Sequence, residues 1–224
     1  MLAEYDAAAW HATDAVLATH PKQGSPWQYV AQKTAAGWVV DFGRLSANRD
    51  KFLVSAEAVQ GASATAFTVK SFEPAREDTG WMLCAAKAIS TTMQAFSGPQ
   101  RPYNVAVIPA ENEELYVYLY PAQVKDGIYP LGADVRYRVS SDGGSIIEKR
   151  QMHRGIIESP PPAKENDETV VGGYHSHVLS DVPEDTDVLH VLAQQPRVPE
   201  VVITEKYLYT VGVDGKITRE KKPR

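Results

Sequence analysis

Apolar and polar residues follow a helical spacing at the start of the chain and a strand-like spacing directly after it. Residues 3–19 are rich in alanine and place Ala7, Trp10 and Leu17 among the apolar positions of a helix. Proline and glycine in "HPKQGSP" end this helix. Three or four strand-like runs follow, separated by turn-forming residues: 27–34, 37–45, 51–59 and 64–72. The pattern predicts a small helix-plus-antiparallel-strands unit of unknown role over residues 1–74.

The polar, proline-containing stretch "SFEPARED" marks the boundary to a second predicted domain, residues 75–224. A largely apolar helix is expected first, and strand hairpins alternate with one further helix after it. The expected elements are a helix at 79–96, hairpins at 104–122 and 134–158, a helix at about 182–195 and a last hairpin at 200–219. Helices interspersed with hairpins predict an α+β fold for the chain.

Composition and charge narrow the classes of function. The chain has 224 residues and a net charge of −5, which argues against general nucleic-acid binding. No apolar run is long enough for a membrane span, and the N-terminus lacks the basic region of a signal peptide. The single cysteine, Cys84, fits a reducing compartment, so we expect a cytoplasmic protein. A secreted or periplasmic protein trimmed of its signal is the alternative.

Two predicted strand pairs carry side chains that could bind a partner. Tyr116, Tyr118 and Tyr120 share one face of a strand and could line a peptide-binding groove, although a covered sheet face explains them more simply. The next hairpin is basic and could bind an anion or a peptide carboxylate, although a solvated strand face is the simpler interpretation. Its basic residues are Arg136, Arg138, Lys149, Arg150 and Arg154.

The stretch "VVGGYHSHVLSDVPEDTDV" combines two histidines with an acidic helix start. His175 and His177 project from the same face of a strand and could chelate one ion. Helix capping accounts for Asp181 and Glu184, because an N-cap aspartate with a glutamate three residues later is a capping-box pattern. It does not account for Asp187 as well, so this residue is the candidate third ligand.

Two glycines, Gly172 and Gly173, precede the histidines and would allow close approach of backbone or substrate. A catalytic zinc site needs three protein ligands and an open position for water. A fourth protein ligand such as His153 or His190 would instead close the site and make the metal structural.

Taken whole, the stretch resembles the JAMM (MPN+) metallo-isopeptidase motif, in which a strand ends in His-x-His and a Ser-x-x-Asp begins a helix. The resemblance is greatest to bacterial JAMM-like domains, and the order of elements extends it over about residues 79–218. It implies a mixed β-sheet flanked by helices, zinc as cofactor and a peptide or protein as substrate. By position, His175, His177 and Asp187 match the metal ligands of the family.

This sequence departs from the family at two catalytic positions. Glu184 stands where the family has the serine that helps to stabilise the oxyanion, and Val178 replaces a usual proline. The family's general-base glutamate has no counterpart in "QRPYNVAVIP", so Glu158 and Glu148 are the candidates, with Glu114 as a further substitute. Loss of a general base costs about 10²–10⁴-fold in rate.

Two functions therefore stay open. The resemblance implies a zinc-dependent peptidase or isopeptidase in which zinc-bound water is the nucleophile and the loop 159–168 chooses the substrate. The departures favour the alternative, a non-catalytic JAMM-like domain that binds a peptide or protein partner. Neither prediction includes a nucleic-acid or membrane partner, and the sequence leaves the oligomeric state open.

Overall fold

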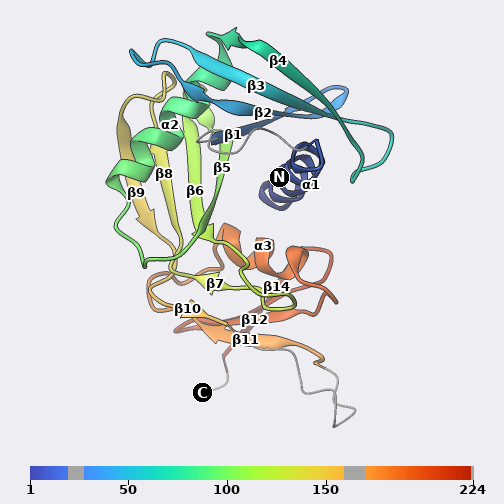
Figure 1. Cartoon of the computed structure of the whole chain (residues 1–224). Coiled ribbons are helices and arrows are strands. Elements are labelled where there is room, and N and C mark those ends of the chain that lie inside the picture. The colour runs from blue at the N-terminus through green and yellow to red at the C-terminus, as the bar shows by residue number, and fades with distance from the viewer. Residues whose placement is uncertain (20–27, 159–169, 223–224) are drawn as a thin grey trace.

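A computed structural model describes residues 1–19, 28–158 and 170–222 (Figure 1). The α-helices are α1 (Leu2–Leu17), α2 (Trp81–Ala95) and α3 (Asp185–Ala193), and a 3-10 turn, η1, spans Glu111–Glu113. The strands of the first half are β1 (Gln28–Thr34), β2 (Gly37–Leu45), β3 (Phe52–Gln60), β4 (Phe67–Asp78), β5 (Tyr103–Pro109) and β6 (Leu115–Pro121). Those of the second half are β7 (Leu131–Gly132), β8 (Val135–Val139), β9 (Ile146–Gln151), β10 (Ile156–Ile157), β11 (Gly173–Ser176), β12 (Glu200–Ile203), β13 (Tyr207–Val211) and β14 (Ile217–Lys221).

The prediction of an α+β fold was wrong, because the protein is predominantly β. Strands make up 42% and helices 21% of the structure, in four sheets with three helices among the described residues. The helix expected at 182–195 spans only Asp185–Ala193. The polar stretch expected as a joint continues instead as a strand, since β4 pairs with β3 as far as Phe52 opposite Asp78. Strand pairing thus overrides local polarity.

The helices also lie between sheets rather than on the outside of one sheet. The N-terminal sheet has the order β1-β2-β3-β4, and the middle sheet the order β5-β6-β8-β9. One core joins α1 to residues of both sheets, and a second core does the same for α2. The expected domain boundary near residue 74 falls inside β4, and both cores contain residues from either side of it.

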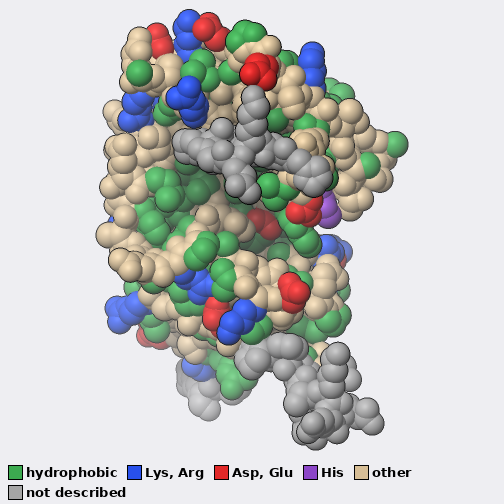
Figure 2. Space-filling model, viewed as in Figure 1, with side chains coloured by type: hydrophobic (Ala, Val, Ile, Leu, Met, Phe, Trp, Pro, Cys, Tyr) green, Lys and Arg blue, Asp and Glu red, His purple; other side chains and the backbone are tan. Residues whose placement is uncertain are grey.

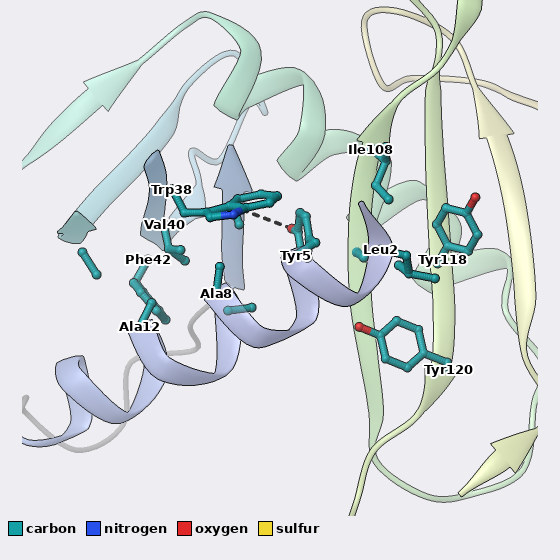
Figure 3. Close-up of a cluster of buried hydrophobic side chains, with 14 of the residues drawn as sticks. Leu2, Tyr5, Ala8, Ala12, Trp38, Val40, Phe42, Ile108, Tyr118 and Tyr120 are labelled. Carbon is teal, nitrogen blue, oxygen red and sulfur yellow. Dashed lines mark hydrogen bonds between the residues drawn. The ribbon is translucent and has the colours of Figure 1, made fainter. Parts of the chain in front are cut away.

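The small residues of α1 allow the helix to approach the N-terminal sheet closely. Ala8 and Ala12 face Val40 and Phe42 of β2, while Leu2 lies toward the middle sheet (Figure 3). Tyr5, which is 1% exposed, accepts a hydrogen bond of 3.1 Å from the backbone N–H of Ala31 in the edge strand β1.

Both candidate binding faces of the middle sheet are engaged within the chain. Tyr118 and Tyr120 are buried and donate hydrogen bonds to Asp185 of α3 (2.8 Å) and Asp6 of α1 (2.7 Å). The basic strands form ion pairs with neighbouring carboxylates. These are Arg136 with Asp185, Arg138 with Glu114 and Glu148, and Arg150 with Glu184.

The C-terminal sheet has the order β11-β12-β13-β14 and lies beyond α3, away from the N-terminal sheet (Figure 1). β11 pairs with β12 in parallel, and the remaining pairs are antiparallel. A small core around Val191, Val202 and Val211 fixes α3 on this sheet. The start of α3 and the end of β11 are thereby brought together. None of the described helices is long and apolar enough to cross a membrane.

Two buried tyrosines provide a matched test of this packing. Tyr5→Phe leaves the buried backbone N–H of Ala31 without a hydrogen-bond acceptor, so we expect the free energy of unfolding to fall by about 1–3 kcal/mol. Tyr137 is also fully buried, but its hydroxyl makes no hydrogen bond with any residue that the structure describes. Tyr137→Phe should therefore be neutral or stabilising. Urea denaturation of both variants measures the difference, and equal losses would contradict this account of α1.

Candidate metal centre

Four side chains from three separate segments converge below the middle sheet. They are His153, His175, His177 and Asp187, and one ligand atom from each lies within 4.8 Å of all the others. His175 lies on β11 and His177 directly follows it, so strand alternation places both rings on one face. Asp187 lies in the first turn of α3, and His153 follows β9.

The ligand atoms face one another at nearly equal distances. Nε2 of His153 and Nε2 of His175 each lie 3.1 Å from Oδ1 of Asp187, and Nε2 of His177 lies 3.1 Å from Oδ2. Nε2 of His177 lies 2.9 Å from Nε2 of His153 and 3.0 Å from Nε2 of His175. Zinc bonds of about 2.0–2.1 Å in a tetrahedron place ligand atoms roughly 3.3 Å apart. The spacing therefore suits a single ion.

Three acceptors fix the outer nitrogens of the imidazoles. Nδ1 of His153 faces both carboxylate oxygens of Asp134 at 2.9 and 3.1 Å, and Nδ1 of His175 faces Oε1 of Glu200 at 2.9 Å. Nδ1 of His177 lies 3.0 Å from the carbonyl oxygen of Val182. Since each acceptor requires a proton on Nδ1, the neutral rings turn their Nε2 lone pairs toward the centre. Such a set of lone pairs around a carboxylate needs a cation.

The electrostatics of the metal-free cluster show the same requirement. Burial opposes the charged form of His153, but hydrogen bonds with Asp134 and Asp187 outweigh it and raise its pKa to about 10. Burial likewise opposes charge on His175, but Asp187 and Glu200 raise its pKa to about 9. Protons thus take the place of a metal ion in the metal-free protein.

Asp187 is prepared as a ligand by its position in the helix. Its side chain is fully buried, and its Oδ2 accepts a hydrogen bond of 2.7 Å from the backbone N–H of Glu184, the N-cap of α3. Burial opposes its ionisation, but the three histidines outweigh this effect and hold its pKa well below the usual range. Oδ1 is buried and faces Nε2 of both His153 and His175 at 3.1 Å, so it points to the centre that a metal ion would occupy.

The helix begins at Asp185, so Glu184 rather than Asp181 is the N-cap. A side chain in the first turn points back toward the N-terminus of its helix, and this direction carries Asp187 to the histidines.

The three predicted metal ligands thus lie together, whereas each of the three candidate catalytic glutamates is held in an ion pair, and Glu184 is the one that adjoins a ligand, through its capping box with Asp187. Glu158 pairs with Arg101 at 2.9 Å, Glu148 with Arg138 at 3.2 Å and Glu184 with Arg150 at 2.7 Å. The expected loop 159–168 lies outside the described residues.

Two supporting acids, Asp134 and Glu200, were missed by the sequence analysis. Both are buried, at 1% and 6% exposure. Glu200 stands at the start of the apolar strand "EVVI", and an acid in such a run is a signal that could have been noticed. The structure explains Gly173 as well, since a Cβ there would lie 2.0 Å from Oε2 of Glu200.

Comparison of this chain with family models, with curated proteins and with solved structures finds no match. The buried cluster could hold a metal ion, and this conclusion rests on its geometry.

Gly173→Ala tests the support of His175 by Glu200. The added methyl must displace the Glu200 carboxylate, and loss of such an outer partner lowers metal affinity by about 10–100-fold. Gly155→Ala is the matched control, because a Cβ at Gly155 has no neighbour within 4 Å. Competition with a chromogenic zinc chelator measures both affinities. Equal affinities for the two variants would contradict the assigned role of Gly173.

Proposed function

We propose that His153, His175, His177 and Asp187 hold one zinc ion, and that the protein is a non-catalytic, JAMM-like domain that binds a peptide or protein. One observation carries this proposal: four protein ligand atoms converge at one point. Their side chains are between 0% and 9% exposed. Four protein ligands characterise structural zinc sites, whereas catalytic sites keep one position for water.

The donor set favours zinc among the common metals. Three imidazole nitrogens and one carboxylate oxygen suit zinc in a four-coordinate site. Calcium and magnesium prefer six or more oxygen donors, which this cluster does not supply.

The proposed ion acts as a cross-link between segments. His153 follows the middle sheet, His175 and His177 belong to the C-terminal sheet, and Asp187 belongs to α3. In the described part of the chain, the core of the C-terminal sheet has four buried side chains: Val191, Val202, Tyr209 and Val211. A cross-link to the larger middle sheet would therefore add much of the stability of this part of the chain.

The positions of the acids favour binding over hydrolysis. Asp134 and Glu200 hold histidine rings, and Glu184 pairs with Arg150 at the start of α3. A carboxylate at Glu184 in place of the family's serine would repel a developing oxyanion. The resemblance of His175, His177 and Asp187 to the metal ligands of JAMM proteins supports a relationship to that family, but it does not support the family's activity.

A zinc-dependent peptidase is the second candidate, and one cavity favours it. This cavity, of about 180 Å³, is lined by His153, His175 and the apolar side chains of Leu131, Met152, Ile156, Val178 and Leu179. In this case zinc has three protein ligands and a water molecule. His153, oriented by Asp134, is then the general base that the sequence analysis did not find.

Zinc content tests the cluster directly. We expect about one zinc ion per wild-type chain by elemental mass spectrometry. Mutation of a residue that only supports a ligand lowers metal affinity by about 10–100-fold. His153→Ala and His177→Ala each remove a ligand, so each should lower zinc affinity by more than this. His11→Ala, on α1 and outside the cluster, is the control and should retain zinc. A wild-type protein that holds no zinc after dialysis against it would overturn the proposal.

The same His153→Ala variant separates the two candidate functions. A structural fourth ligand predicts loss of zinc and a lower melting temperature. Without bound zinc, the free energy of unfolding falls by about 4 kcal/mol relative to wild type, if free zinc exceeds the wild-type dissociation constant about a thousandfold. A general base instead predicts retained zinc and peptidase activity that falls by about 10²–10⁴-fold. Zinc-loaded wild-type protein that hydrolyses peptide or isopeptide substrates would establish the second function.

A further inference from the structure

A second cavity lies on the other side of α3 from the C-terminal sheet. It has a volume of about 660 Å³ and lies between α1, α3 and the end of β6, where Figure 2 shows a hollow lined largely by apolar side chains. We call it the α1–α3 cleft. Its volume falls in the range of about 300–1,000 Å³ that is typical of small-molecule sites.

A half-buried acid, Asp6, lines this cleft without a cation beside it among the described residues. Asp6 of α1 accepts hydrogen bonds from the hydroxyl of Tyr120 at 2.7 Å and from Nδ2 of Asn104 at 3.3 Å. It forms no ion pair with another residue in the described part of the chain. Burial raises its pKa, although Tyr120 and Asn104 act in the opposite direction. An approaching cation would therefore stabilise the ionised carboxylate.

Two residues that line the same cleft from α3, Thr186 and His190, each carry a polar side-chain atom without a hydrogen-bond partner among the described residues. Thr186 is 3% exposed, and its Oγ1 has no partner among these residues. His190 is half-buried, and its buried Nδ1 likewise has no partner there. Buried polar atoms without partners are uncommon and cost about 1–3 kcal/mol each. A ligand that donates hydrogen bonds would satisfy them, and an ammonium group has three donors and no acceptor.

The walls of the cleft suit an apolar stem. Trp10 is 61% exposed at the rim and stacks on His11, with ring centroids 5.1 Å apart. Tyr29, Leu131 and Leu189 continue the apolar lining. Exposed aromatic rings also attract cations through their π faces.

The charge of the lining favours a cation. Among the described residues, the carboxylates of Glu4, Asp6 and Asp134 line the cleft together with one guanidinium, that of Arg197. Glu4 is paired with Lys33 and Asp134 is held by His153, so Asp6 is the carboxylate available to a ligand.

From these observations we propose that the α1–α3 cleft binds an organic cation on an apolar stem, with Asp6 as its counter-ion and Thr186 and His190 as hydrogen-bond partners. A lysine side chain of a peptide and a free alkyl amine share this chemistry. The inference rests on the proposed function in that zinc would hold α3, one wall of the cleft, in place.

Calorimetric titration with three probes tests the cleft in the zinc-loaded protein. The probes are Nα-acetyl-lysine methylamide, n-hexylamine and the neutral Nα-acetyl-norleucine methylamide. We expect both cations to bind at least tenfold more tightly than the neutral probe. Tighter binding of the lysine derivative than of hexylamine would identify a peptide ligand, and the reverse a free amine. Equal affinity for lysine and norleucine derivatives would overturn the proposal.

Matched variants locate the binding. Asp6→Asn removes the charge while keeping the shape, and should weaken cation binding at least tenfold. Asp14→Asn changes an exposed acid of the same helix outside the cleft and should leave binding unchanged. Thr186→Val should also weaken binding without destabilising the free protein, because its hydroxyl has no partner to lose. Unchanged binding in both Asp6→Asn and Thr186→Val would overturn the assignment.

Zinc content of the same samples keeps the two proposals separable. A protein with one zinc ion that shows no preference for cations contradicts the cleft proposal alone. A protein that binds the cations selectively but never holds zinc contradicts the proposed metal centre, and shows that the cleft binds cations without an ion to hold α3.

Discussion

The convergence of three imidazole nitrogens on the buried carboxylate of Asp187 is the constraint on which the C-terminal third of this protein depends. The cluster joins the end of β9, the end of β11 and the start of α3. Because outer acceptors orient all three rings, their lone pairs point inward and repel one another unless a cation lies between them. An ion bound there, as proposed, would therefore add to the apolar packing that positions α3.

The support around the cluster is as specific as the cluster itself. Asp134, Asp187 and Glu200 are all buried, so three negative charges face three imidazoles. A divalent ion offsets two of these charges, and protons on the histidines offset them in the metal-free protein. The absence of a side chain at Gly173 is part of the same arrangement, since it makes room for the Glu200 carboxylate.

The two sides of α3 serve different purposes in the function proposed here. One side belongs to the metal centre, where every ligand position is filled from the protein and the acids needed for proton transfer hold other groups. The opposite side lines a cleft with Asp6, which has no ion-pair partner among the described residues, and with polar atoms that no described residue satisfies. A stable metal cross-link on one side would position the wall of a binding site on the other.

The sequence by itself determined the local features of this protein: the strand that presents His175 and His177, the acidic start of α3 with Asp187, and most hairpins. These follow from alternation along a strand and from the first turn of a helix, which involve residues near one another in the chain. It did not determine the predominance of β-structure, because β4 owes its last residues to pairing with β3. Only the tertiary structure decided that His153 completes the cluster and that Asp134 and Glu200 orient its rings. Those contacts join residues up to 34 positions apart (His153 and Asp187), and their geometry depends on how sheets pack rather than on any local pattern.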